Sequence, residues 1–339
     1  MHPRKLIIQI PCYNEELTLP TTLRALPRTI AGVDVVEWLV VDDGSCDRTS
    51  AVARELGVDH IVRHTSNQGL ARAFATALDA ALRLGADVIV NTDADNQYDA
   101  RDIPALIDPI LRGDAEMVVG DRRTDDVPHF STAKKRLQKL GSWAVRQASQ
   151  TTIPDTTSGF RAYSRDAAFK LNVVSDFTYT LETIIQAGRK NIAVAHVPVR
   201  TNERLRDSRL FSNLRTYVAR SVVTILRIYV MYRSMRVFLT VGGIIFGGGF
   251  LIGCRFVFYF LSGTGAGHIQ SLLLAVLLMV VGFQTALTGL LADLVGNNRR
   301  LLEETLWRVR RLEHEPGTRD RTTERIERTG EPVEPAVHS

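Results

Sequence analysis

Two aspartates that follow an apolar run are the first residues in this sequence that could do chemistry. Asp93 and Asp95 come at the end of the run DVIVNTD (87–93), which is typical of a buried strand. Because the two carboxylates are two residues apart at a strand end, both can turn toward one hard divalent cation, and Gln97 is spaced to add a neutral oxygen. The pattern predicts a Mg²⁺ or Mn²⁺ site that bridges the protein to a diphosphate. Acids exposed at a surface turn are the alternative for so short a motif.

A second acidic motif ends another apolar run. Asp42-Asp43-Gly44-Ser45 closes the stretch EWLVVDD (37–43). A carboxylate at such a position can bond ribose hydroxyls or a base N–H, as acidic residues do in dinucleotide-binding folds. Asp47 leads into the next helical stretch and is typical of a helix cap. We therefore expect Asp42 and Asp43 to remain free for a ligand.

Basic residues supply candidate phosphate contacts, since the planar fork of arginine can bind two phosphate oxygens at once. Asp155 comes three residues before Ser158-Gly159-Phe160-Arg161, where the glycine allows backbone to approach a ligand closely. The basic candidates are Arg122, Arg123, the triplet Lys134–Arg136 with Lys135 at its centre, Arg161, and the cluster 204–209 with Arg206 and Arg209. A solvated basic face is the alternative for each of them.

These residues need elements that bring them together. Apolar runs at 6–11, 37–43, 87–93 and 116–120 read as strands, and they alternate with helical stretches at 15–26, 48–56, 71–84 and 103–111. This alternation predicts a doubly wound, Rossmann-like α/β domain over residues 1–211, in which ligands bind at the carboxyl ends of the strands. Both acidic motifs fall at such ends.

Two long apolar segments follow the α/β region. Residues 237–261 hold one charge, Arg255, and residues 269–292 hold none. Each exceeds the roughly 20 residues that a helix needs to cross a bilayer, whereas buried core helices of this length usually show a polar face. The short link 262–268 predicts a transmembrane hairpin over 237–292. Its small-residue pairs, Gly243/Gly247 and Gly249/Gly253, could seat a neighbouring helix, so the chain could form a homo-oligomer through this hairpin.

The charge of the chain is concentrated next to these segments. Residues 1–211 hold 27 basic and 27 acidic residues, so the net charge of +5 comes from residues 212–236, which carry five arginines and no acid. Residues 212–236 also place their apolar side chains on one arc, which predicts an amphipathic helix at a membrane surface, with packing against the catalytic domain as a compatible alternative. Residues 293–339 are expected to form a short cytoplasmic helix and a disordered tail.

The same charge pattern predicts orientation and excludes some functions. Basic residues flank both apolar segments and none lies in the link, so both termini and the catalytic domain are expected on the cytoplasmic side of the cell (inner) membrane.

The modest net charge argues against a nucleic-acid partner. Three widely spaced cysteines exclude a disulfide scaffold. Neither a P-loop nor a Gly-x-Gly-x-x-Gly motif follows the first predicted strand, which excludes a P-loop protein and a dinucleotide-dependent oxidoreductase.

Together the motifs resemble a known family. Pro11-Cys12-Tyr13-Asn14-Glu15-Glu16, Asp42-Asp43-Gly44-Ser45, Asn67-Gln68-Gly69, Asp93-Ala94-Asp95-Asn96-Gln97 and Ser158-Gly159-Phe160-Arg161 occur in the order seen in family 2 glycosyltransferases of the GT-A fold. The set is similar to the dolichyl- and polyprenyl-phosphate sugar synthases over about residues 5–235, and the two-span tail resembles that of bacterial polyprenyl-phosphate glucosyltransferases.

The resemblance implies a role for each matching residue. Pro11, Tyr13, Glu15 and Asp42 would line the nucleoside pocket, and Asp43 would be a nucleotide-side acid. Asp93, Asp95 and Gln97 would hold the metal, with Asp95 counted among the catalytic residues. Arg122 or Arg123 would contact phosphate, Asp155 would be an active-site acid, and Arg161 and Arg206 would contact the acceptor phosphate. Lys135 and Arg209 are further candidates for that contact.

The implied activity is inverting, metal-dependent transfer of one hexose from a nucleotide-sugar to polyprenyl phosphate, making a lipid-linked sugar donor for cell-envelope glycans or glycoproteins. UDP-glucose is the first donor expected, with GDP-mannose as the alternative. Whether Asp155 acts as a base or only positions groups stays open. A processive polysaccharide synthase would carry Gln-x-x-Arg-Trp, which this chain lacks. A catalytically inactive membrane scaffold is the rival from another class.

Overall fold

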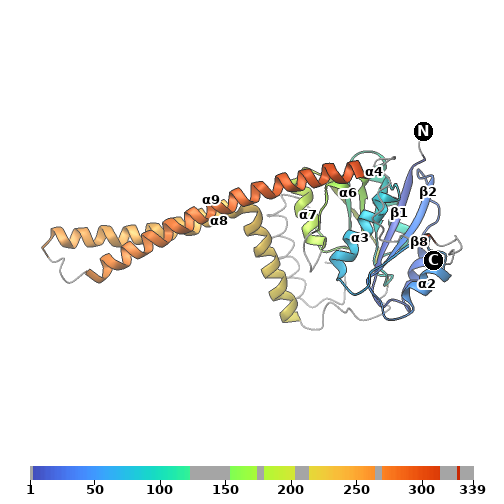
Figure 1. Cartoon of the computed structure of the whole chain (residues 1–339), viewed down its shortest axis with the longest axis horizontal. Coiled ribbons are helices and arrows are strands. Elements are labelled where there is room, and N and C mark those ends of the chain that lie inside the picture. The colour runs from blue at the N-terminus through green and yellow to red at the C-terminus, as the bar shows by residue number, and fades with distance from the viewer. Residues whose placement is uncertain are drawn as a thin grey trace, which may run out of the picture. The chain divides into compact units, whose positions relative to one another are not determined.

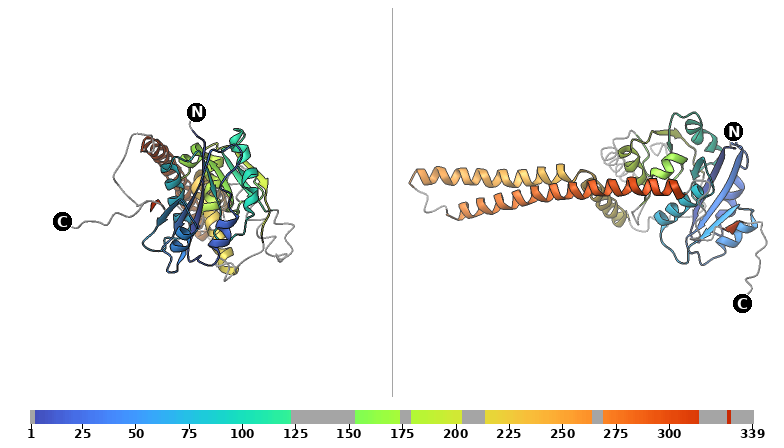
Figure 2. Two further views of the ribbon diagram at one scale, coloured as in Figure 1. Left: turned by 90° about the vertical axis from the view of Figure 1, so that its right-hand side faces the viewer. Right: turned by 45° about the horizontal axis from the view of Figure 1, so that its top comes forward.

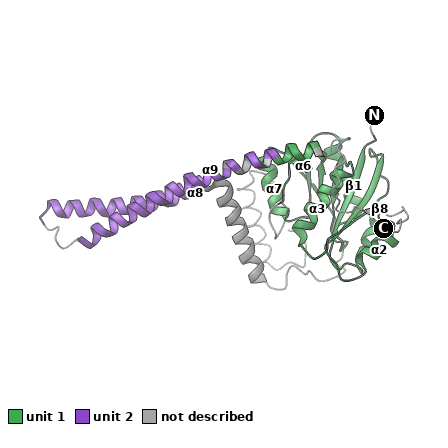
Figure 3. Cartoon of the chain, viewed as in Figure 1, with its two compact units in different colours: residues 1–219, 306–339 green, residues 220–305 purple. Residues whose placement is uncertain are grey.

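The computed structural model describes residues 3–122, 153–173, 179–202, 214–263, 269–313 and 327–328, without the side chains of 214–234, 297, 299, 300, 303, 313, 327 and 328. Two compact units are present. One comprises residues 1–219 and 306–339, and the other comprises residues 220–305 (Figure 3).

A mixed β-sheet forms the centre of the first unit (Figure 1). Its strands lie in the order β7-β5-β6-β4-β1-β2-β3-β8. Their bounds are β1 Lys5–Cys12, β2 Val35–Asp42, β3 His60–Arg63, β4 Val88–Asn91, β5 Met117–Asp121, β6 Arg161–Ser164, β7 Val194–Pro198 and β8 Glu327–Arg328. β1 pairs in parallel with β2 and β4, and β2 with β3. The predicted α/β fold is confirmed.

The sheet departs from the predicted parallel arrangement at β6 and at the edge strand β8, which pairs antiparallel with β3. β6 runs antiparallel between β4 and β5. It begins at Arg161, so the segment expected to be a ligand loop continues directly into a buried strand whose Ala162 and Tyr163 are fully covered. Its sequence RAYS begins with arginine and ends with serine, so it lacks the apolar run from which a strand is predicted.

Helices cover both faces of the sheet (Figure 2). The helices of this unit are α1 Leu19–Ala25, α2 Thr49–Glu55, α3 Leu70–Arg83, the 3₁₀ turn η1 Ala100–Asp102, α4 Ile103–Leu111, α6 Arg165–Lys170 and α7 Tyr179–Arg189. One apolar core joins α1 and α4 to β1, where Leu6 and Ile8 pack with Leu23 and Leu106. α3 lies against β1 and β2 and also contacts α6 and α7.

Two long helices provide the second unit. α8 spans Leu214–Leu261 and α9 spans Ile269–Glu313, so each predicted apolar segment is part of a longer, unbroken helix. Within them, Met235–Leu261 and Ile269–Gly296 are long and apolar enough to cross a membrane, and most of their side chains are exposed. A core helix of a soluble domain is mostly buried, whereas only 11% and 17% of these two segments is buried, and their crossing of a membrane stays a prediction. The predicted amphipathic face falls on side chains outside the described residues.

Glycines let α8 and α9 pack backbone against backbone. A Cβ at Gly249 would lie 2.9 Å from the carbonyl oxygen of Ala275, and one at Gly282 would lie 2.5 Å from the backbone nitrogen of Phe246. Such spacing leaves no room for a larger residue at these contacts, which fits the predicted hairpin. A Cβ at Gly243 or Gly247 would meet no described atom within 4 Å, and self-association through them stays a prediction.

Candidate active site

An ion pair joins the end of β5 to the turn before β6. The Arg122 guanidinium donates from Nε to Asp155 Oδ2 at 2.7 Å and from Nη2 to Asp155 Oδ1 at 3.0 Å. Thr157 completes the arrangement, because its Oγ1 accepts from Arg122 Nη2 at 2.8 Å and donates to Asp155 Oδ1 at 3.0 Å. Bidentate geometry of this kind fixes the plane of the guanidinium. Two of the residues expected at the site are therefore brought into direct contact.

The two charges stabilise each other. Burial alone would raise the pKa of Asp155, but the charge and hydrogen bonds of Arg122, together with hydrogen bonds from Thr157, lower it below its usual value. Burial likewise opposes the charge on Arg122, and the neighbouring Tyr98 and Asp155 raise the pKa of the guanidinium above its usual range. Asp155 is thus an ionised carboxylate already committed to a cation, which makes it a weak base.

Asp93 lies beside the glycine of the turn before β6. A Cβ at Gly159 would be 3.1 Å from Asp93 Oδ2 and 2.9 Å from the Tyr179 hydroxyl, so only glycine fits without displacing one of them. Asn91 of β4 holds this glycine, since its side-chain amide donates to the Gly159 carbonyl at 2.8 Å. The backbone approach predicted for Gly159 is thus an approach to Asp93.

Tyr98 is a site residue that the sequence analysis missed. Its hydroxyl accepts a hydrogen bond from the Gly159 N–H at 2.9 Å. Burial raises the pKa of Tyr98 to about 12, and the charges of Arg122, Asp93 and Asp155 all act on it. The phenol therefore stays protonated at ordinary pH and lies among the three charged side chains. The one sequence signal for a site role was its position directly after the candidate ligand Gln97. A lone tyrosine is more often a core residue, and the Tyr98 ring does stack on the buried ring of Phe160.

The expected metal ligands occupy the loop after β4. Asp93, Asp95 and Gln97 are each partly exposed, and Asp95 Oδ1 accepts from the Gln97 backbone N–H at 3.1 Å. All three offer hard oxygen donors, which suit Mg²⁺ or Mn²⁺. Among the described residues, no three His, Cys, Asp or Glu side chains converge as a metal-binding group. This donor set fits an ion that takes its remaining ligands from water and a diphosphate, rather than a closed protein cage.

The acidic pair after β2 is engaged within the protein, which differs from the expectation that it stays free. Asp42 is buried and accepts from the Ser45 N–H at 2.8 Å and from the Ser50 hydroxyl. Asp43 accepts from the Gln68 and Gly69 N–H groups at 2.9 and 2.8 Å. The cause is the turn at Gly44, where φ is +70° and a Cβ would collide with the backbone of Ser66. Their roles toward a nucleoside stay predictions.

His64 is a second residue that was missed. It is buried, with Nδ1 2.7 Å from Asp43 Oδ1 and Nε2 3.0 Å from Thr76 Oγ1. These contacts connect the acidic turn after β2 to helix α3. No motif marked this histidine, because its partners are far away in sequence.

The remaining donor-side candidates lie at the end of β1. Pro11 is buried in the strand, Tyr13 is 39% exposed, and Glu15 is buried with its Oε2 accepting from the Thr18 hydroxyl at 2.5 Å. The exposed ring of Tyr13 is the one large aromatic surface among the three. The structure thus leaves part of the Tyr13 ring exposed and places Glu15 in the turn before α1, and their roles toward a nucleoside stay predictions.

Arg161 is placed differently from its expected role. It is fully buried, and its guanidinium donates to the carbonyl groups of Thr156, Ser158 and Thr180 and to the Thr183 hydroxyl, at 2.7–2.9 Å. Every guanidinium nitrogen already donates to a protein oxygen, so in this structure Arg161 fastens the turn of Asp155 to α7 and does not face a phosphate. The other basic candidates, Arg123, Lys135, Arg206 and Arg209, lie outside the described residues.

Comparison with known proteins places this site in a family. The family described as "Glycosyl transferase family 2" matches residues 7–171. An uncharacterized glycosyltransferase of Mycobacterium bovis is 31% identical over 57% of this chain and 83% of its own length. The chain belongs to glycosyltransferase family 2. The family-matched segment carries the Asp42–Ser45, Asp93–Gln97 and Asp155–Arg161 motifs, and the predicted enzyme class is confirmed.

Two further relatives of this glycosyltransferase have named activities. The polyprenol monophosphomannose synthase of Mycolicibacterium smegmatis is 29% identical over 59% of this chain and 78% of its own. The UDP-N-acetylglucosamine–dolichyl-phosphate N-acetylglucosaminyltransferase of Methanococcus voltae is 29% identical over 59% of this chain and 87% of its own. Both names describe transfer of a sugar to a polyisoprenoid phosphate.

A solved structure supports the GT-A fold. Glucosyl-3-phosphoglycerate synthase from Mycobacterium tuberculosis, crystallised with Mn²⁺, UDP and phosphoglyceric acid, superposes with a TM-score of 0.52 over 67% of this chain and 78% of its own. The two sequences are 21% identical, so the likeness concerns the fold.

Proposed function

We propose that this glycosyltransferase transfers one hexose from a nucleotide-sugar to the phosphate of a membrane polyprenol. The observation that carries the proposal is the convergence of Asp93, Arg122 and Asp155 beside Gly159, in a chain that also has two exposed apolar helices. The relatives that attach sugars to polyprenol and dolichyl phosphates support the acceptor class.

The reaction is a displacement at the anomeric carbon. An oxygen of the lipid phosphate forms a bond to C1 of the sugar, the bond from C1 to the donor diphosphate breaks, and the electron pair leaves with the nucleoside diphosphate. Attack from the opposite face inverts the configuration. Because a phosphate monoester has a second pKa of about 6, the acceptor is already ionised near pH 7 and needs no strong base.

The residues of the chain bind and orient the reacting groups. Arg122, held in one plane by Asp155, is a rigid cation for a phosphate group. Asp155 acts as its positioning residue, in keeping with the lowered pKa of Asp155. Tyr98, protonated at ordinary pH, adds a buried hydroxyl beside Asp93. A Mg²⁺ or Mn²⁺ ion held by Asp93, Asp95 and Gln97 would neutralise charge on the leaving diphosphate.

The two apolar helices would bring the enzyme to its lipid acceptor. We propose that Met235–Leu261 and Ile269–Gly296 span the cell membrane, with the catalytic unit and both termini in the cytoplasm. The arginines of residues 212–236 would then lie at the headgroups. Replacing Arg215, Arg220 and Arg227 with serine should lower transfer to membrane-bound acceptor more than donor hydrolysis. An equal loss of both would contradict this membrane role.

UDP-glucose is the proposed donor, on the resemblance of the two-span tail to polyprenyl-phosphate glucosyltransferases, and GDP-mannose is the alternative. The test incubates membranes containing the full-length protein with added polyprenyl phosphate and labelled UDP-glucose, GDP-mannose or UDP-N-acetylglucosamine. We expect label in the lipid extract from one donor, loss of that label with EDTA, and its return with Mg²⁺ or Mn²⁺. Asp95→Ala is the inactive control.

Calorimetry on the same protein distinguishes an enzyme from a scaffold. Binding of UDP or GDP that strengthens with Mn²⁺ is expected. If no donor yields labelled lipid and no nucleotide binding depends on metal, the transferase proposal fails and an inactive scaffold is the better description.

A further inference from the structure

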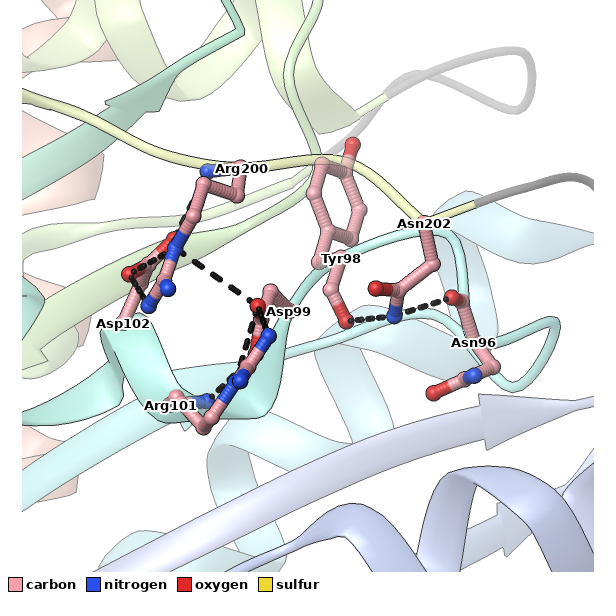
Figure 4. A network of polar contacts seen from close by, with 7 residues as sticks. All are labelled: Asn96, Tyr98, Asp99, Arg101, Asp102, Arg200 and Asn202. Carbon is pink, nitrogen blue, oxygen red and sulfur yellow. Dashed lines mark hydrogen bonds and ion pairs between the residues drawn. The ribbon is translucent and has the colours of Figure 1, made fainter.

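Asn202 makes hydrogen bonds to the loop that carries the candidate metal ligands. Its side-chain amide donates to the carbonyl groups of Asn96 at 3.0 Å and Tyr98 at 3.2 Å. Its backbone N–H donates to the carbonyl of the residue between them, Gln97, at 2.9 Å. One residue from the segment after β7 therefore bonds three consecutive carbonyl groups, with sequence separations of 106 and 104 residues for the two side-chain bonds, which Figure 4 shows.

The loop that Asn202 bonds has an unfavourable backbone conformation. Residues 92–97 form neither helix nor strand, and Asn96 has φ of +55°. This left-handed conformation costs a non-glycine residue about 1–2 kcal/mol and persists only where the surroundings impose it. The turn at Asn96 sets the direction of Asp95 and Gln97 on either side of it. Release of its carbonyl groups would let the loop relax and both ligand side chains move.

The neighbours of Asn202 anchor the segment but do not reach the ligands. Arg200 binds Asp102 through its backbone N–H at 2.7 Å and through its guanidinium, and its carbonyl accepts from the Asp99 N–H at 3.2 Å. Thr201 forms a bridge with Tyr98. The Arg200 guanidinium is more than half exposed, and exposed ion pairs contribute at most about 1 kcal/mol. Asn202, which is partly buried, is the residue that bonds the loop between Asp95 and Tyr98.

We propose that Asn202 is a positioning residue of the catalytic site, which fixes the backbone of Asn96–Tyr98 and so holds Asp95 and Gln97 in the geometry that receives the metal-bound donor. The inference rests on the proposed function, since it assigns Asn202 to the donor side of that site. Outer-sphere groups that orient ligands change metal affinity by about 10–100-fold when they are removed.

Asn202→Asp is the sharpest test. The substitution keeps the size of the side chain but replaces its donating amide with an oxygen that faces two carbonyl groups. Mn²⁺ affinity in the presence of UDP is measured by electron paramagnetic resonance on the full-length protein in detergent, without acceptor or turnover. We expect the affinity to fall at least tenfold and kcat/KM for the donor to fall in parallel.

Asn202→Ala serves as the second variant if Asn202→Asp does not fold. It removes the two side-chain hydrogen bonds and keeps the backbone bond to Gln97, so a smaller loss of Mn²⁺ affinity in the same direction is expected. Gln186→Ala is the matched control, because Gln186 also uses its amide to hold backbone, at Asn172, away from the metal loop. It should lower thermal stability and leave Mn²⁺ affinity unchanged.

The outcomes are distinguishable. Wild-type Mn²⁺ affinity in both Asn202 variants overturns the positioning role and leaves the proposed function intact. An equal loss of affinity in Gln186→Ala also overturns it, because general destabilisation would then explain the effect. A wild-type protein that binds neither Mn²⁺ nor UDP overturns the proposed function and this inference with it.

Discussion

Asp155 holds Arg122 through two guanidinium nitrogens, at 2.7 and 3.0 Å, at the end of the strand that leads into the candidate active site. This ion pair joins the residue directly after β5 to the turn before β6. It makes Arg122 a preoriented cation, and it leaves Asp155 little capacity to accept a proton.

Asp155→Asn should remain an active transferase. Asparagine keeps the shape of the side chain and an oxygen for Arg122, and the acceptor phosphate needs no base. We expect a loss in kcat of about tenfold or less, whereas removal of a true general base costs about 10²–10⁴-fold. The measurement is initial rate of label transfer into lipid, with Asp95→Ala for comparison. A loss of several hundredfold in Asp155→Asn would restore the base interpretation.

The Arg122–Asp155 pair should stabilise the fold over the whole neutral range. The pKa of Asp155 is lower in the folded protein than the value of about 3.9 in an unfolded chain, so its stabilisation is fully present above that value. It is lost as the pH falls through the lower, folded pKa. The difference in unfolding temperature between wild type and Asp155→Asn should therefore be constant from about pH 5 to 8 and shrink below about pH 4. A difference that disappears between pH 6 and 7 would contradict the lowered pKa.

Gly159→Ala should weaken metal and nucleotide binding. The added methyl would lie 3.1 Å from Asp93 Oδ2 and 2.9 Å from the Tyr179 hydroxyl, so Asp93 must move. We expect Mn²⁺ affinity with UDP to fall about tenfold or more. Gly113→Ala is the control: it meets no atom within 4 Å but has φ of +80°, so it should cost stability of about 1–2 kcal/mol and leave binding unchanged. Equal binding in both variants would refute the close approach.

Arg161→Lys should lower the stability of the fold rather than the affinity for the acceptor. Lysine cannot make all the hydrogen bonds that Arg161 makes to the carbonyl groups around it, and each buried acceptor left unpaired costs about 1–3 kcal/mol. A clear drop in unfolding temperature is expected. Arg48→Lys, at an exposed ion pair with Glu55, should have almost no effect. If Arg161→Lys instead raised the KM for the lipid acceptor at unchanged stability, Arg161 would be a phosphate contact after all.

Gly282→Val should separate the two helices of the second unit. Its Cβ would lie 2.5 Å from the backbone nitrogen of Phe246, so the valine side chain cannot fit between α8 and α9. We expect a lower unfolding temperature in detergent. Gly243→Val is the matched control, since a Cβ there meets no described atom within 4 Å. Should Gly243→Val reduce cross-linking between copies at unchanged unfolding temperature, the predicted self-association through this face would gain support.

Much of the fold follows from local patterns. The apolar runs at 6–11, 37–43, 87–93 and 116–120 correspond to β1, β2, β4 and β5, because a strand buried on both faces is apolar throughout. The predicted helices are present: the one over 103–111 has the bounds of α4, and the others have shifted ends. α1 begins at Leu19 rather than residue 15, because the chain turns over residues 13–18 and Asn14 has positive φ. The exceptions are β3, β6, β7 and β8. β4 and β5 are equally short, but the sequences HIVR, RAYS, VAHVP and ER of the missed strands begin with or are interrupted by polar residues, so they lack the apolar run from which a strand is predicted.

The sequence by itself determined the chemistry available: acids at strand ends, a small-residue turn at Gly159, and two segments too long and apolar for a soluble core. Motif order was enough for the family, because each motif is local. Only the tertiary structure decided which of these side chains bond to other parts of the protein. Asp42, Asp43 and Arg161 make hydrogen bonds within the protein. Arg122 pairs with Asp155, and Asn202 bonds the loop of Asp95. Hydrogen-bond partners tens of residues apart meet through sheet pairing and loop closure, which no local pattern of residue types encodes.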